Sequence, residues 1–181
     1  MNHQDHVDLL RDGIQAGHAQ VWADFGSGRG AFTLALAALL PQSAAIYSID
    51  RDRRALEHQE SRLHARFPDR PVTYLPADFT RPLELPPLDG IVMANALHYQ
   101  RHKGPVLSLI KAYLRPTGRL ILVEYNVDSG NRWVPYPLSY PSWEKLARQN
   151  GFWPTRLLAV KPSHFLGQFY SALSFLPPQP H

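Results

Sequence analysis

The chain has 181 residues, of which 44% are hydrophobic and 19% charged, and its formal net charge is +4. This length predicts a single domain over residues 1–181, and the composition excludes a disordered chain. Because the chain contains no cysteine, disulfides, thiol nucleophiles and cysteine-bound metals are excluded as well.

Charge and hydropathy patterning indicate a cytoplasmic protein. The first residues lack the basic and apolar runs of a secretion signal, and the longest apolar stretch, Ala31–Leu40, is about half a membrane span. We therefore expect no membrane contact. Basic and acidic residues are interspersed, which argues against a nucleic-acid partner, although the positive net charge leaves one open. The sequence does not indicate an oligomeric state.

Short β-type runs alternate along the chain with amphipathic helical stretches, which is typical of a parallel sheet covered by helices on both faces. The predicted strands are Val21–Phe25, Ala45–Ile49, Val72–Leu75, Ile91–Ala94 and Leu120–Tyr125. The predicted helices are Arg29–Leu40, Arg53–Phe67, Val106–Leu114 and Trp143–Gln149, the last with Ser142 as its N-cap. Proline-rich Arg81–Gly90 is predicted as a loop.

Two further β-type runs, Leu157–Val160 and Phe169–Leu176, close the sequence with no helix-length segment between them. A parallel crossover needs a longer connection, so these runs should form an antiparallel hairpin at the edge of the sheet. The predicted fold is therefore α/β and doubly wound, with a mostly parallel sheet.

Three glycines connect the first predicted strand to the first predicted helix, in the stretch Val21–Ala31. Glycine permits a tight turn with positive φ and lets a ligand approach the backbone closely, and the helix start favours an anionic ligand group. Gly26, Gly28 and Ala31 match the dinucleotide spacing G-x-G-x-x-G/A, whereas Gly26, Gly28 and Gly30 match G-x-G-x-G. The glycines indicate a nucleotide-like cofactor without deciding which one.

Carboxylates end three successive predicted strands. Asp24 stands two residues before the first glycine, where it would repel a pyrophosphate and attract an ammonium group. Asp50 is placed to bind the two hydroxyls of a ribose. Asp78 could accept a hydrogen bond from an adenine amino group, with Phe79 as a stacking surface. The alternative interpretation is three unrelated surface or helix-capping acids.

These stretches resemble the Rossmann-like, S-adenosylmethionine-dependent methyltransferases, whose sheet has seven strands with the last one inserted antiparallel. The resemblance covers residues 20–176. It is carried by ADFGSGRGAF, IYSIDRD, LPADFT, DGIVMANALHY and LRPTGRLILVEY. Two departures are Pro116-Thr117-Gly118 in place of Pro-Gly-Gly, and Asn95-Ala96-Leu97-His98 in place of the motif found in enzymes that methylate base amino groups.

The resemblance implies a set of residues that bind S-adenosylmethionine. The methionine part would be held by Asp24 and the loop from Gly26 to Gly30, the ribose by Asp50, the adenine by Asp78 and Phe79, and the methyl donor would lie beside Asn95 and Ala96. The full predicted set is Asp24, Gly26, Ser27, Gly28, Gly30, Asp50, Arg51, Ala77, Asp78, Phe79, Asn95 and Ala96.

His98 follows the fourth predicted strand and is the candidate catalytic base, because histidine titrates near neutrality. The alternative is that it shapes the pocket. Weaker candidates are Tyr99, His102, Glu124 and Tyr125. The remaining histidines lack metal-ligand spacing, so we expect no metal.

Aromatic residues alternate with prolines between the fifth predicted strand and the following helix, at Trp133, Tyr136, Tyr140 and Trp143. They could form a lid over a planar or apolar acceptor, or a stiffened loop packed on the sheet.

The sequence therefore predicts an S-adenosylmethionine-dependent methyltransferase that acts on an unidentified small-molecule acceptor. Three alternatives stay open: an NAD(P)-dependent oxidoreductase, a non-catalytic S-adenosylmethionine-binding module, and an RNA methyltransferase.

Overall fold

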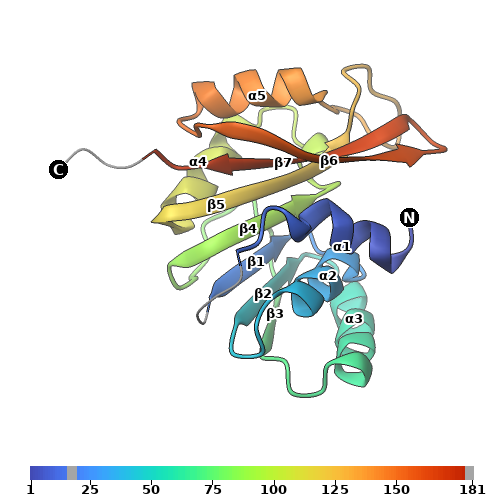
Figure 1. Cartoon of the computed structure of the whole chain (residues 1–181), viewed down its shortest axis with the longest axis vertical. Helices are drawn as coiled ribbons and strands as arrows, with labels where there is room; N and C mark the ends of the chain where they lie inside the picture. Colours follow the sequence, from blue (N-terminus) through green and yellow to red (C-terminus); the bar gives the residue numbers. More distant parts are fainter. Residues whose placement is uncertain (16–19, 178–181) are drawn as a thin grey trace.

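The computed structural model describes residues 1–15 and 20–177 and contains a seven-stranded sheet with helices on both faces (Figure 1). The strand order is β3-β2-β1-β4-β5-β7-β6, and all neighbouring pairs are parallel except β5–β7 and β7–β6. The strands are β1 Val21–Phe25, β2 Ala45–Asp50, β3 Val72–Pro76, β4 Leu88–Ala94, β5 Leu114–Tyr125, β6 Thr155–Ser163 and β7 Gly167–Phe175. The predicted doubly wound fold and its antiparallel edge hairpin are confirmed.

The helices divide between the two faces of the sheet. They are α1 His3–Arg11, α2 Ala31–Leu39, α3 Arg53–Arg66, α4 Gly104–Tyr113 and α5 Tyr140–Gln149, with a short 3₁₀ turn, η1, at Leu97–Tyr99. Buried residues of α1, α2 and α3 pack on one face around Trp22 and Val92. Those of α4 and α5 pack on the other face around Phe25 and Met93. The two central strands, β1 and β4, therefore contribute buried residues to both cores.

Helix α1 was not predicted from the sequence, because the first residues look polar. Asn2 and Asp5 form a capping box, in which each side chain accepts from the other's backbone N–H at 2.9 Å. Val7 and Leu10 lie one turn apart and are buried against α2. Lys161 of β6 then pairs with Asp5 and Asp8, at 3.2 and 2.8 Å. The capping pattern was the signal that could have revealed this helix.

Several element boundaries differ from those predicted. Strand β4 begins at Leu88, inside the segment predicted to be a loop. Residues 115–118, which separate the predicted helix Val106–Leu114 from the predicted strand Leu120–Tyr125, lie inside β5. There the β4–β5 register moves from Leu88↔Leu114 to Gly90↔Arg119 and so accommodates extra residues. Helix α5 is capped by Ser139 instead of Ser142, with proline in its first turn.

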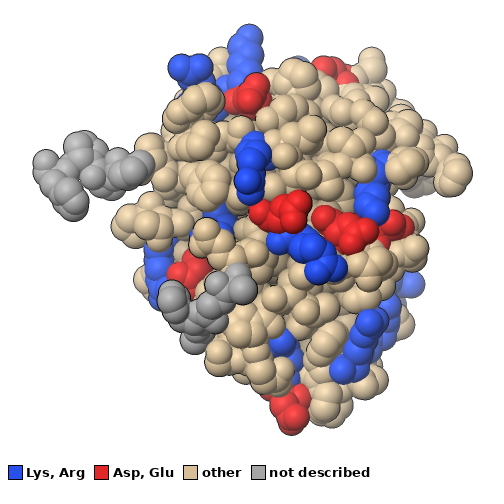
Figure 2. Space-filling view, viewed as in Figure 1, with Lys and Arg blue, Asp and Glu red and all other residues tan. Residues whose placement is uncertain are grey.

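Charged side chains of both signs lie close together on the face that carries α1 (Figure 2). This agrees with the ion pairs between α1 and β6. Among the described residues, no helix is long and apolar enough to cross a membrane.

Candidate active site

The glycine loop after β1 turns sharply beneath the end of β4. Gly26 has φ +74°, and its N–H donates to the carbonyl of Ile49 at 2.8 Å. A Cβ at Gly26 would lie 2.7 Å from the Cβ of Ala96 and 3.2 Å from the Phe79 ring. Both the conformation and the space therefore require glycine, and the backbone is left open to a ligand.

Asp50, the last residue of β2, connects the loop to the start of α3. Its carboxylate accepts from the N–H of Gly28 at 2.8 Å and from the N–H of Asp52 at 2.8 Å. Asp52 in turn caps α3 by accepting from the N–H groups of Arg54 and Ala55. Asp50 is thus fixed in position, and each of its oxygens accepts one hydrogen bond from the described residues, which leaves further lone pairs for a ligand.

Asp24 lies deeper than the sequence suggested, with 1% of its surface exposed. Its carboxylate accepts from the Thr33 hydroxyl at 2.7 Å. Burial raises the pKa of Asp24 to about 7, and the hydrogen bond from Thr33 opposes this shift. Next to it, the Ser27 hydroxyl accepts from Ser48 and Gln59. These groups hold the loop from beneath.

Asp78 and Phe79 follow β3 and face the same edge. Asp78 accepts from the backbone N–H and the hydroxyl of Thr80 at 2.9 and 2.7 Å, and these bonds hold the pKa of Asp78 below its usual value. The Phe79 ring stacks on Phe25 at 6.2 Å. An ionised carboxylate and a flat ring therefore stand side by side.

The end of β4 carries an unusual backbone conformation. Asn95 has φ +51°, a left-handed value that non-glycine residues seldom adopt, and its N–H donates to Val123 at 2.9 Å. Its side-chain oxygen is buried and has no hydrogen-bond partner among the described residues. Such an outlier at a strand end is typical of a functional site.

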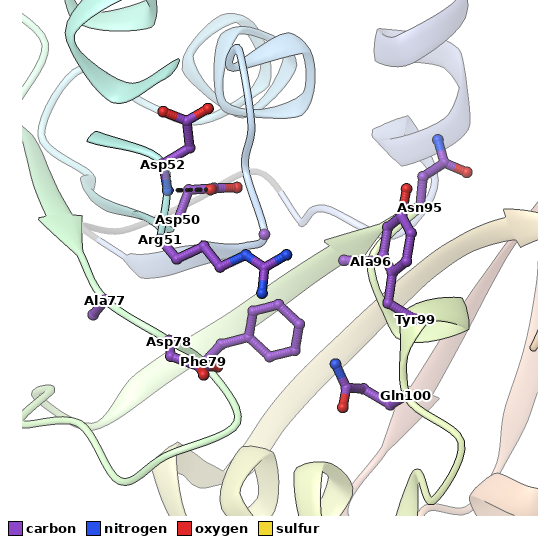
Figure 3. A pocket seen from close by; sticks show the side chains of 11 residues that line it. Asp50, Arg51, Asp52, Ala77, Asp78, Phe79, Asn95, Ala96, Tyr99 and Gln100 are labelled. Carbon is purple, nitrogen blue, oxygen red and sulfur yellow. Dashed lines mark hydrogen bonds between the residues drawn. The ribbon is translucent and has the colours of Figure 1, made fainter. Parts of the chain in front are cut away.

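A cavity of about 330 Å³ opens at this edge of the sheet. It is lined by Gly26, Asp50, Arg51, Asp52, Ala77, Asp78, Phe79, Asn95, Ala96, Tyr99 and Gln100. Figure 3 shows two sides, with Asp50, Arg51 and Phe79 facing Asn95 and Tyr99.

The cavity brings together most of the residues predicted to bind the cofactor. Four predicted residues do not line it: Asp24, Ser27, Gly28 and Gly30. Asp52 and Gln100 were not predicted, and Tyr99 had been considered only as a base. Each of these three lies within six residues of a predicted strand end, and this proximity was the signal that could have found them.

His98 is buried behind the cavity, with 2% of its side chain exposed. Its Nδ1 lies 2.7 Å from Oε2 of the fully buried Glu124, and its backbone N–H donates to Oε1 at 3.1 Å. Its Nε2 is buried and has no partner among the described residues. In this conformation His98 fixes the turn that carries Tyr99, and it does not line the cavity.

The four aromatic residues of the predicted lid separate into two pairs. Trp143 is fully buried in α5, and Tyr140 packs edge-on against Tyr170. Trp133 and Tyr136 are exposed, and the Tyr136 N–H donates to the His98 carbonyl at 3.0 Å. The segment 131–136, which carries Trp133 and Tyr136, therefore contacts η1, whereas Tyr140 and Trp143 pack in the core.

The expectation that the protein binds no metal stays a prediction. In residues 1–15 and 20–177, no group of three or more histidine or acidic side chains is placed to hold a metal ion.

Comparison with known proteins shows which family the chain belongs to. A family model described as a methyltransferase domain matches residues 23–120, more than half of the chain. The chain belongs to the methyltransferase domain family. The resemblance stated from the sequence is confirmed for the family, and the oxidoreductase alternative is set aside. No curated protein sequence matches the chain.

Solved structures share the fold at low sequence identity. A methyltransferase dependent on S-adenosylmethionine from Aquifex aeolicus is 17% identical, with a TM-score of 0.74 over 96% of this chain and 90% of that one. The YcgJ protein of Bacillus subtilis is 12% identical, with a TM-score of 0.79 over 98% and 100%. A Haemonchus contortus phosphoethanolamine N-methyltransferase, solved with S-adenosylhomocysteine, is 14% identical, with a TM-score of 0.75 over 97% and 53%.

Proposed function

We propose that the cavity at the carboxyl ends of β1 to β4 binds S-adenosylmethionine and that the methyl group passes to a small-molecule acceptor. The observation that carries this proposal is the cavity itself, which has the Asp50 and Asp78 carboxylates and Phe79 on one side and Asn95 and Tyr99 on the other. A site of this size surrounds a nucleoside better than a macromolecule.

The residues on the first side fit an adenosine. Asp50 has lone pairs directed to the cavity and would accept from ribose hydroxyls, while Asp78 would accept from the adenine amino group beside the Phe79 ring. The Gly26 backbone, which a Cβ would cover, would lie against the methionine part. Asp24, buried under the loop, would act by fixing the loop through Thr33.

S-adenosylmethionine supplies a methyl group on a sulfonium, which is transferred as the carbon–sulfur bond breaks. The chain's contribution is chiefly placement, because an in-line displacement depends on holding the two reactants aligned. Asn95 and Tyr99 line the side of the cavity away from the adenosine, where an acceptor would enter. The proton of a hydroxyl acceptor needs a base, and His98 could serve only if its buried Nε2 becomes exposed to the cavity. We therefore assign His98 and Glu124 a positioning role in the conformation described.

Titration calorimetry with S-adenosylhomocysteine tests the proposal. The protein should bind this product saturably and should not bind NADH. Asp50→Ala should weaken binding about 10- to 100-fold, because it removes both the ribose acceptor and the anchor of the Gly28 N–H. The control is Glu57→Ala on the exposed surface of α3, which should leave binding unchanged.

Asp50→Asn controls for folding, because it retains one side-chain oxygen. Unchanged affinity in both Asp50 variants would overturn the cofactor placement. A gel shift with transfer RNA at physiological salt addresses the acceptor class, and tight binding there would replace the small-molecule acceptor by RNA.

A further inference from the structure

A row of aromatic rings extends from the acceptor side of the cavity. Tyr99 lines the cavity with 59% of its surface exposed, and its ring centroid lies 4.3 Å from that of His98. The His98 ring lies 6.3 Å from Tyr125, the last residue of β5. Tyr125 lies 6.0 Å from Phe165, in the turn between β6 and β7, which is 50% exposed. We call Tyr99, Tyr125 and Phe165 the aromatic row.

The row is held in place by the fold. Glu124 binds both the ring and the backbone N–H of His98, which fixes the turn before Tyr99. Tyr125 pairs with Phe169 across the β5–β7 ladder, and their rings lie 4.3 Å apart. Two large rings at the ends of the row, Tyr99 and Phe165, are thus exposed to water, and Tyr99 also lines the cavity. Exposed rings that begin at a ligand cavity are typical of a binding surface.

The exposed charges that follow Tyr99 in sequence are basic. Arg101 is exposed, and in the described part of the chain it forms no ion pair, whereas the Arg132 guanidinium lies over the Trp133 ring at 5.7 Å. Lys103 donates to the carbonyls of Gln100 and Tyr136 at 2.9 and 2.8 Å. Two acids lie nearby in sequence: Glu124 is fully buried against His98, and Asp128 has both oxygens engaged by Ser139. An aromatic surface can also bind an ammonium ion, but this basic border disfavours a cation and favours an anion.

We propose that the methyl acceptor is a planar aromatic molecule with an anionic group, such as a carboxylate, and that its ring lies on the aromatic row. This inference rests on the proposed function. The nucleophilic atom of the acceptor forms a bond to the methyl carbon as the carbon–sulfur bond breaks, the bonding pair stays on sulfur, and the acceptor's proton leaves to solvent.

Binding of three probes to protein saturated with S-adenosylhomocysteine tests this inference without needing turnover. Naphthalene-2-carboxylate is planar and anionic, 2-naphthylmethanol is planar and neutral, and cyclohexanecarboxylate is anionic without an aromatic ring. The first should bind at least about tenfold more tightly than the other two. Equal binding of the three probes would overturn the inference.

Variants locate the surface. Phe165→Leu should weaken the binding of naphthalene-2-carboxylate about three- to tenfold, because a leucine cannot stack on the probe. Arg101→Gln, next to the cavity residues Tyr99 and Gln100, should reduce the preference for the carboxylate over the alcohol. Trp153→Leu changes an equally exposed ring at the start of β6 and should have no effect. Loss of affinity in Trp153→Leu alone would place the probe elsewhere.

The cofactor experiment separates the two proposals. If the wild-type protein does not bind S-adenosylhomocysteine, the proposed function fails. If it binds that product but the three probes do not differ, the function stands and only the acceptor class is wrong.

Discussion

The two sides of the cavity are built by different means. The β1–β3 side consists of glycine backbone and carboxylates whose oxygens are engaged by neighbouring N–H groups, as in Asp50 and Asp78. The β4–η1 side consists of the Asn95 and Gln100 amides and the exposed Tyr99 ring, supported by one buried pair, His98 and Glu124. Backbone geometry restricts the first side to few residue types, whereas side chains on the second can vary with the acceptor.

The largest expected effect comes from breaking the buried pair. His98→Ala leaves Glu124 buried without its partner, and we expect a loss of about 3–5 kcal/mol in the free energy of unfolding. Urea denaturation measures it. The control is His102→Ala, an exposed neighbour, which should stay within about 0.5 kcal/mol of the wild type. Equal effects of the two variants would show that the pair does not support this side.

Asp24, which lies under the glycine loop, makes the free energy of unfolding depend on pH. Its pKa is raised to about 7 in the folded protein, so the protonated form stabilises the fold below about pH 4, and that contribution is lost as the pH rises through 7. Relative to Asp24→Asn, the wild type should therefore lose up to about 4 kcal/mol of unfolding free energy between pH 4 and pH 8. Urea denaturation at several pH values tests this, with exposed Asp69→Asn as the control. A constant difference between wild type and Asp24→Asn would contradict the assignment.

The first side should tolerate a methyl group at one glycine better than at another. Gly26→Ala places a Cβ against Ala96 at positive φ, so we expect a loss of about 1–3 kcal/mol in the free energy of unfolding. We also expect this variant to lose S-adenosylhomocysteine binding. Gly28→Ala has positive φ but no atom within 4 Å, and its stability loss should be about 1 kcal/mol. Thermal denaturation and calorimetry compare them. If Gly28→Ala proved the more damaging, the close approach at Gly26 would be unimportant.

The smallest effect is expected at Lys103, which ties the segment 131–136 to η1. Lys103→Met removes its two bonds to carbonyl oxygens and should cost about 1 kcal/mol. Hydrogen exchange should become faster in residues 131–136 and stay unchanged in Gly26–Gly30. Unchanged exchange in both segments would mean that the lysine does not hold the loop.

The strand order and the first side of the cavity could be predicted because each depends on local pattern. β-type runs, the glycines and the acids that follow strands are readable in sequence, and parallel strands bring their carboxyl ends to one edge. The pairing of His98 with Glu124 joins residues 26 positions apart, and no local pattern contains it. The burial of Asp24 and Trp143 depends on packing between elements in the same way.

The extent of α1 shows a limit of composition. Its nine residues contain three buried apolar side chains among charged ones, so its amphipathic pattern is short. Helix α5 illustrates the same point at a boundary, because Ser139 and Ser142 are both suitable N-caps in sequence and the fold selects the first.

Hydrogen exchange with and without S-adenosylhomocysteine tests the division of the cavity most directly. Protection should appear at Gly26–Gly30, at residues 50–52, at residues 77–80 and at residues 95–97, and should be absent from residues 131–136 and from the β6–β7 turn. Protection confined to the aromatic segments, or no change at the glycine loop, would contradict the placement of the cofactor on the β1–β3 side.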